Sequence, residues 1–151
     1  MWLSIILVLG LQVGLIHKLR FDVRATKIHI REIVPEIVAL LPKNESLITV
    51  DPESDGAYGT QMRYHLYMAG RNSGGDISSY FNATEKNIRN RLDMNNTQFI
   101  WVHSITPGVL KAISPELKKG ASYFMEREGS GWKVLKSWPF KGYLSPVEVK
   151  D

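Results

Sequence analysis

Two histidines, His65 and His103, lie among aromatic residues in segments that the sequence pattern predicts as strands. If those strands are neighbours, both imidazoles share one sheet face, where a transition metal could bind. Such a site needs a third ligand and a position for water. No H-x-H, H-E-x-x-H or C-x-x-C spacing supplies that ligand, and the chain has no cysteine. We therefore predict no metal site, and we interpret His17 and His29, which flank basic residues, as surface groups.

Motifs for nucleophilic or phosphate chemistry are also missing from the sequence. There is no G-x-S-x-G elbow around any serine. The glycines of residues 70–75 precede a predicted helix, but they match neither G-x-G-x-x-G nor G-x-x-x-x-G-K-[ST]. We therefore predict no catalytic residues and no cofactor, and a protein that is not an enzyme.

One set of side chains resembles a binding surface more than a reaction centre. Tyrosine, tryptophan and arginine are the residues that most often anchor protein contacts. The predicted alternation places them with two histidines on one face of the sheet, and Phe99 lies at its edge. This possible partner face comprises Arg63, His65, Tyr67, Trp101 and His103. The alternative is that these residues lie beneath a helix at residues 35–41 or beneath the C-terminal tail.

An uncharged N-terminal stretch sets the location of everything that follows it. Residues 2–16 would form a helix of about 22 Å, somewhat shorter than the roughly 30 Å hydrocarbon core of a bilayer. Leu19 and Phe21 extend the apolar character, and the long side chains of His17, Lys18 and Arg20 can reach the headgroups. We predict a transmembrane anchor at residues 1–21. The alternatives are a cleaved signal peptide, although no basic n-region or A-x-A-like site is present, and a helix lying on the membrane surface.

The net charge of +4 is concentrated next to this anchor. Residues 32–151 carry equal numbers of basic and acidic side chains, so no basic surface for nucleic acid is predicted. The basic residues suit a bilayer with anionic headgroups; they lie at the end of the predicted anchor and in a predicted basic juxtamembrane segment at residues 22–33. They are Lys18, Arg20, Arg24, Lys27 and Arg31.

The orientation of the chain in the membrane stays open. The positive-inside rule favours a cytoplasmic domain. Three N-x-[ST] patterns, at Asn44, Asn82 and Asn95, and the absence of cysteine are compatible with an extracytoplasmic one.

The anchor itself indicates protein neighbours. Gly10 and Gly14 form a G-x-x-x-G pair, which lets a second helix approach closely, and the Gln12 amide is costly in hydrocarbon unless it is hydrogen-bonded. We therefore expect a single-pass, non-catalytic accessory or assembly subunit of a larger membrane complex, with other membrane subunits as partners. The alternative is a tethered domain that captures a soluble ligand or protein on the sheet face.

Residues 34–151 are predicted to form one α+β domain that ends in an extended tail. Helical spacing predicts a helix that begins or kinks near Val34, and a second helix at residues 76–92 with Asp76 as its N-cap. A single helical turn is predicted at residues 109–113. Alternation and turn residues predict a mostly antiparallel sheet of about five strands, packed on one or two helices. The predicted strands are residues 46–51, 60–69, 98–105, 121–128 and 132–138.

Overall fold

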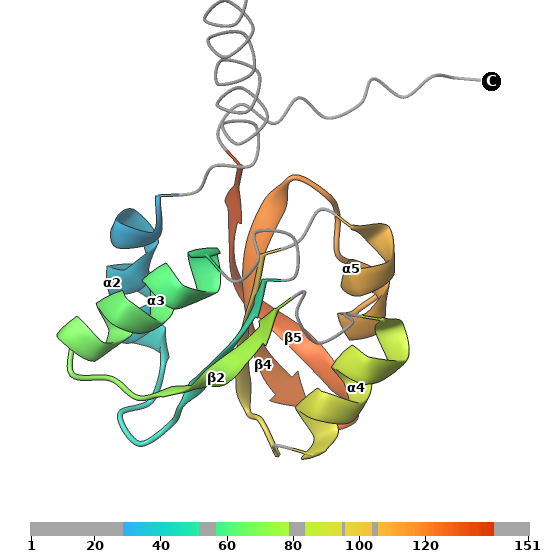
Figure 1. Ribbon diagram of the computed structural model, residues 1–151, viewed down its shortest axis with the longest axis horizontal. Helices are drawn as coiled ribbons and strands as arrows, with labels where there is room; N and C mark the ends of the chain where they lie inside the picture. Colours follow the sequence, from blue (N-terminus) through green and yellow to red (C-terminus); the bar gives the residue numbers. More distant parts are fainter. Residues whose placement is uncertain (1–28, 52–56, 79–83, 95, 104–105, 141–151) are drawn as a thin grey trace, which may run out of the picture.

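The computed structural model describes residues 29–51, 57–78, 84–94, 96–103 and 106–140. Within these ranges the fold is α+β, with one five-stranded mixed sheet and four helices (Figure 1). In chain order the elements are α2 (Ile30–Leu40), β1 (Leu47–Asp51), α3 (Ala57–Met68), β2 (Ser73–Ser78), α4 (Glu85–Met94), β3 (Phe99–His103), α5 (Pro107–Ile113), β4 (Ala121–Glu128) and β5 (Gly131–Pro139).

The sheet has the strand order β2-β1-β3-β4-β5. Strand β1 runs parallel to both of its neighbours, whereas β4 runs antiparallel to both β3 and β5. The prediction of a mostly antiparallel sheet is therefore wrong. Parallel neighbours require a long crossover connection, and α3 supplies it between β1 and β2.

Helices cover both faces of the sheet (Figure 1). On one face α2 and α3 bury Ile37, Met62 and Leu66 against a cluster that includes Trp101. On the other face α4 and α5 bury Ile88 and their other apolar residues against a second cluster. All residues of β1 and β3 are buried, as expected for strands covered on both faces, and β3 lies within the strand predicted at residues 98–105.

The segment predicted as a strand at residues 60–69 is the helix α3. Met62 and Leu66 face the core in either conformation, because a spacing of four residues fits one helical turn and also two strand repeats. Tyr64 and Met68, which the strand pattern placed on the same face, are exposed in the helix. The local pattern was ambiguous, and packing against α2 and the sheet selects the helix.

The helix predicted at residues 76–92 is shorter and begins later. Asp76 and Ile77 belong to β2, and α4 starts at Glu85, where the Thr84 hydroxyl accepts a hydrogen bond from the Asn87 N–H at 3.3 Å. Ile77 and Ile88 are buried in the same cluster but come from different elements. Their spacing in the sequence fits one helix, but the two residues reach the same core from a strand and from a helix.

The helix predicted near residue 34 begins at Ile30 and contains Pro35 in its interior. Ile30 and Ile33 are buried in the core, so the end of the segment predicted as juxtamembrane belongs to the folded domain. Arg31 points outward from the same helix. The predicted anchor lies outside the described residues, and within them no helix combines the length and the apolar character that a membrane span requires.

The strands predicted at residues 46–51, 121–128 and 132–138 and the helical turn predicted at residues 109–113 are confirmed, whereas the predicted C-terminal tail beyond residue 140 lies outside the described residues. Strand β1 matches the first predicted strand, α5 extends the predicted helical turn, and the hairpin of β4 and β5 closes at Gly129 and Ser130.

Arg127 of β4 links the C-terminal end of α4 to the sheet through hydrogen bonds and an ion pair. Its Nη2 donates to the Leu92 carbonyl at 2.9 Å and its Nε to the Thr97 carbonyl at 2.8 Å. Its Nη1 lies 3.2 Å from the Asp93 carboxylate, and the guanidinium stacks on the Trp132 ring at 4.8 Å. The planar guanidinium holds its N–H donors in a fixed fork. One side chain can therefore bond to the Leu92 carbonyl, which is unpaired within the end of α4, and to the Thr97 carbonyl beyond the helix.

Replacement of Arg127 by methionine should lower the free energy of unfolding by about 2–4 kcal/mol, because two buried carbonyls lose their donors. Arg89→Met is the matched control: the contacts of Arg89 with the Glu85 carboxylate and the Lys111 carbonyl are both exposed to solvent, so its loss should change stability by no more than about 0.5 kcal/mol. Equal losses in chemical denaturation of the two variants would contradict this role of Arg127.

Candidate functional site

Polar side chains gather at the carboxyl ends of the parallel strands, on the face that α3 covers. We call this group the polar edge; it comprises Thr49, Asp51, Asp76, His103 and Ser122. Register supports the grouping, because Thr49 is paired with Asp76 and His103 with Ser122. Residues paired across strands point to the same face of a sheet.

The chain topology marks this edge as a location for ligand sites. After β1 the chain continues into α3 on one face, and after β3 it continues into α5 on the other. Crevices between adjacent parallel strands whose connections leave in opposite directions are where open α/β sheets bind ligands. The polar edge lies at this switch point.

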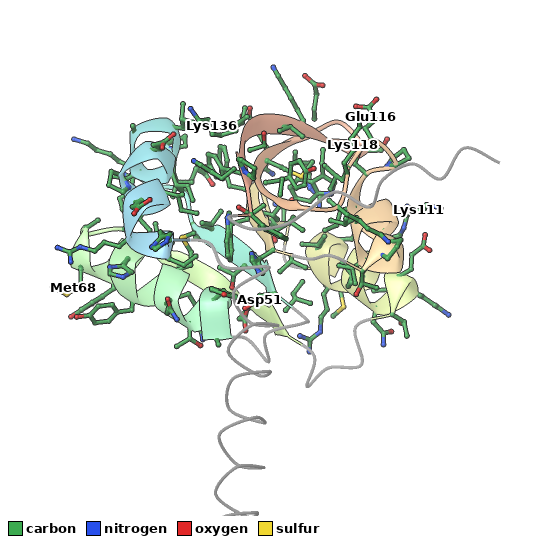
Figure 2. All side chains as sticks on the ribbon, turned by 90° about the horizontal axis from the view of Figure 1, so that it is seen from above. Asp51, Met68, Lys111, Glu116, Lys118 and Lys136 are labelled. Atoms are coloured by element: carbon green, nitrogen blue, oxygen red, sulfur yellow. The ribbon has the colours of Figure 1, made fainter. Side chains whose placement is uncertain are left out.

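Asp51 ends β1 and is fully buried. Its Oδ2 accepts a hydrogen bond from the Gly59 N–H at 2.9 Å. This amide belongs to the first turn of α3, whose N–H groups have no partners within the helix, and a carboxylate there also interacts favourably with the helix dipole. Asp51 therefore anchors the beginning of α3 to the sheet, as its position between the helical layers in Figure 2 illustrates.

Thr49 and Asp76 form a close pair beside the same turn. The Thr49 Oγ1 lies 2.6 Å from the Asp76 Oδ1 and 3.2 Å from the Gly75 carbonyl oxygen. Burial raises the pKa of the Asp76 carboxyl above its ordinary value of 3.8, and the charge of Asp51 acts in the same direction. The Thr49 hydrogen bond, the Arg63 charge and the Ile77 N–H oppose this shift.

His103 is enclosed by rings. The centroid of its imidazole lies 4.4 Å from that of Tyr58, 4.7 Å from Phe140 and 5.5 Å from Trp101. Burial, and to a lesser extent the charge of Asp51, raises the pKa of Tyr58 above 10.0. The buried His103 imidazole therefore contributes to the packing of these three rings.

The polar edge contains Asp, His and Ser on successive strands, which are the residue types of a nucleophilic triad. Asp51, His103 and Ser122 are all buried, so none of these three side chains presents a reactive atom to solvent. Asp51 uses one carboxylate oxygen for a backbone amide. In the part of the chain that the structure describes, no group of three acidic, histidine or cysteine side chains is placed to hold a metal ion.

The possible partner face is not assembled as one surface. Arg63, His65 and Tyr67 lie on α3, where Tyr67 is exposed and the other two are half-buried. Trp101 and His103 lie on β3 and are buried. A sheet that is covered by helices on both faces leaves no open aromatic face, so these five side chains cannot contact a ligand together. The helix-packing residues Gly10, Gln12 and Gly14, and the basic residues Lys18, Arg20, Arg24 and Lys27, lie outside the described residues.

The structure instead exposes large side chains on the outer surface of α3. The outward side of α3 exposes 59% of Tyr64, 77% of Tyr67 and 64% of Met68, and we call these three residues the α3 face. Figure 2 shows Met68 at the outer end of the helix. The Arg71 guanidinium, just after α3, donates to the Leu41 carbonyl, just after α2. This hydrogen bond brings the C-terminal ends of the two helices together, and Leu40 at the end of α2 is also exposed.

The composition around the α3 face differs from an ordinary solvated surface. Residues 57–75 include Arg63 and Arg71 but no lysine, aspartate or glutamate. In α4, by contrast, five of ten residues are charged, and Figure 2 shows Lys111, Glu116 and Lys118 around α5. Protein interfaces are enriched in tyrosine, methionine and arginine and depleted of lysine, glutamate and aspartate. The outward sides of α3 and α4 are therefore chemically distinct.

No protein family, curated protein or solved structure matches this chain.

Sequence reasoning missed Thr49, Asp51 and Asp76, although one signal was present. Asp51 directly follows the buried run of residues 47–50, and a carboxylate at the end of a buried strand often belongs to a site at the sheet edge. The prediction of a second strand at residues 60–69 hid that signal, because two consecutive predicted strands place Asp51 next to the turn that would join them.

Gly59 is required where α3 meets the Thr49–Asp76 pair. A Cβ at this position would lie 2.5 Å from the Asp76 Oδ1 and 3.0 Å from the Thr49 Oγ1. Gly59→Ala should therefore lower the free energy of unfolding by about 1–3 kcal/mol, measured by urea denaturation. Gly108→Ala in α5 is the control: a Cβ there meets no atom within 4 Å, so stability should stay unchanged or rise by up to about 1 kcal/mol. A stabilising Gly59→Ala would show that the pair does not touch the helix.

Proposed function

We propose that this protein is a single-pass, membrane-anchored accessory or assembly subunit of a larger membrane protein complex, and that the α3 face contacts a neighbouring subunit. The exposure of Tyr64, Tyr67 and Met68 on one helix is the observation that carries the proposal.

The free-energy cost of leaving the apolar side chains of the α3 face in water explains why this face supports a protein contact. Exposed aromatic and methionine side chains lose favourable burial, at about 25 cal/mol for each Å² of apolar area left in water. Tyrosine offers a partner a large rigid ring together with a hydroxyl, and such residues commonly account for most of the binding free energy. Residues 57–75 contain no lysine, aspartate or glutamate, which reduces the cost of removing water from this helix.

The anchor adds a second contact in the proposal. The uncharged residues 2–16 would hold the domain at the bilayer, and Gly10, Gln12 and Gly14 would pack against another membrane helix. A tether alone needs neither a small-residue pair nor an amide in hydrocarbon. The two surfaces would then contact the complex from the membrane and from the aqueous side.

Tyr67→Ala combined with Met68→Ala should reduce recovery of partner subunits after gentle detergent extraction by about tenfold or more, because hot-spot truncations each cost more than about 1 kcal/mol. Both side chains are exposed, so the melting temperature of the isolated protein should hardly change. Met94→Ala in α4, where 84% of the side chain is exposed, is the matched control and should leave recovery intact. Unchanged recovery with the double variant, or migration of the wild-type protein alone on native gels, would contradict the proposal.

Gly10→Leu combined with Gly14→Leu should block close helix approach while preserving membrane insertion, since leucine favours insertion. We expect the double variant to stay in the membrane fraction and to lose partner subunits on co-purification. Val8→Leu with Val13→Leu enlarges side chains elsewhere on the same segment and serves as the control. Full recovery with the glycine variant would mean that the segment is only a tether.

A further inference from the structure

The sheet ends in two edge strands, β2 and β5, which differ in how well they are protected against pairing with another strand. We propose that the outer side of β2, which we call the β2 edge, pairs antiparallel with the β2 edge of a second copy of this chain. The two five-stranded sheets would then be continuous across a two-fold axis. The inference rests on the proposed function, because it names a second copy as the subunit that contacts Tyr67 of the α3 face.

The edge formed by β5 carries features that discourage strand pairing. Lys133 and Lys136 are exposed along this strand, and Pro139 ends it. A register shift also interrupts its pairing with β4. Lysine, proline and bulges are the means by which many proteins keep an edge strand from joining another sheet. A second copy is therefore not expected at β5.

The β2 edge has neither lysine nor proline. Its sequence is SGGDIS, and among the described strands only β1 pairs with it. Glycine in a strand is typical of sites that another backbone approaches closely, and Gly74 is exposed. After a register shift at its beginning, residues 75–78 pair regularly with β1. This run leaves a row of backbone N–H and C=O groups on the outer side of the sheet.

One flank of α3 faces the β2 edge. Tyr58 contacts the His103 ring of β3, so its side of the helix faces the middle of the sheet. Tyr67 follows Tyr58 by nine residues, about two and a half turns, and therefore lies on the opposite flank. Arg63 shares that flank with Tyr67, and its charge acts on the Asp76 carboxyl of β2. The exposed Tyr67 ring thus lies on the side of α3 where a second copy would arrive.

The spacing of the layers fits a helix pair across the two-fold axis. Helix α3 contacts both β1 and β2, so it lies over the two strands nearest to the axis (Figure 1). Because strands are about 4.8 Å apart, the helix would lie about 5 Å from an axis next to β2, and two copies of α3 about 10 Å apart. Packed helices are separated by roughly 8–10 Å. Thr60 and Tyr67, both exposed in one chain, would then be covered by α3 of the second copy.

The charges at this boundary are complementary to themselves. Each copy brings one guanidinium, Arg63, and one carboxylate, Asp76, to the side of the β2 edge. The Arg63 Nε has no acceptor among the described residues, and its Nη2 donates to the Thr60 hydroxyl at 3.3 Å. A carboxylate of the second copy would be a stronger acceptor for this guanidinium. Equal numbers of opposite charges mean that two identical surfaces need not repel each other.

Symmetry favours a second copy over an unrelated strand. Antiparallel strands exchange N–H and C=O groups reciprocally, so an open edge is complementary to its own copy under a two-fold axis. Because β5 is protected, pairing through β2 closes after two chains and does not continue into a fibre.

The experiment uses two differently tagged full-length copies that are co-expressed and extracted in mild detergent. Every chain also carries Gly10→Leu and Gly14→Leu, which removes helix packing by the predicted anchor. Recovery of one tag with the other should be efficient for this parent chain. Thr60→Lys combined with Tyr67→Lys should reduce it about tenfold or more, as should Thr60→Glu with Tyr67→Glu, because like charges then meet across the axis.

Co-expression of the lysine variant with the glutamate variant should restore recovery, since opposite charges then meet. Val134→Lys with Ser137→Lys adds the same charge to exposed positions of β5 and, as the matched control, should leave recovery unchanged. The dimer would be overturned by a parent chain without cross-recovery, by equal losses in the control and the α3 lysine variant, or by a mixed pair that recovers no better than either variant alone.

The composition of the recovered material separates this inference from the proposed function. Other subunits recovered without the second tag would overturn the dimer and leave the proposed function standing. A second tag recovered without any other subunit would support the dimer and contradict the larger complex.

Discussion

Burial of the sheet on both faces is the constraint on which the rest of this structure depends. Strands β1 and β3 have no solvent-facing side, so every polar side chain on them must find its partner inside the protein. Thr49 and Asp51 meet this demand through β2 and through the first turn of α3. The position of α3 is thus fixed by polar groups at one end and by Met62 and Leu66 along its length. The helix that carries the exposed tyrosines is also the helix most directly connected to the polar edge.

Helices α3 and α4 both pack on the sheet, but they present different surfaces to the solvent. Both bury apolar residues on the sheet, but α4 turns a charged side to water, which suits a solvated face, whereas α3 turns Tyr64, Tyr67 and Met68 outward. Such a difference has no benefit for the stability of an isolated domain, because exposed apolar area gains nothing from water. It is understandable if α3 meets another protein, and this reasoning links the packing of the fold to the proposed role in a complex.

The sequence by itself determined the elements whose signals are strong over one segment: the uncharged N-terminal stretch, the buried strand β3, the hairpin of β4 and β5, and the α+β class. It also determined the unusual composition of residues 57–75, which is visible without any structure. Only the tertiary structure decided that this segment is a helix, because Met62 and Leu66 satisfy both periodicities until the partner surface is known. The same holds for the parallel pairing of β1 and for the meeting of Thr49, Asp51 and Asp76, which are distant in sequence. Those contacts arise from chain topology, and topology depends on which elements share a core, a property that no local pattern contains.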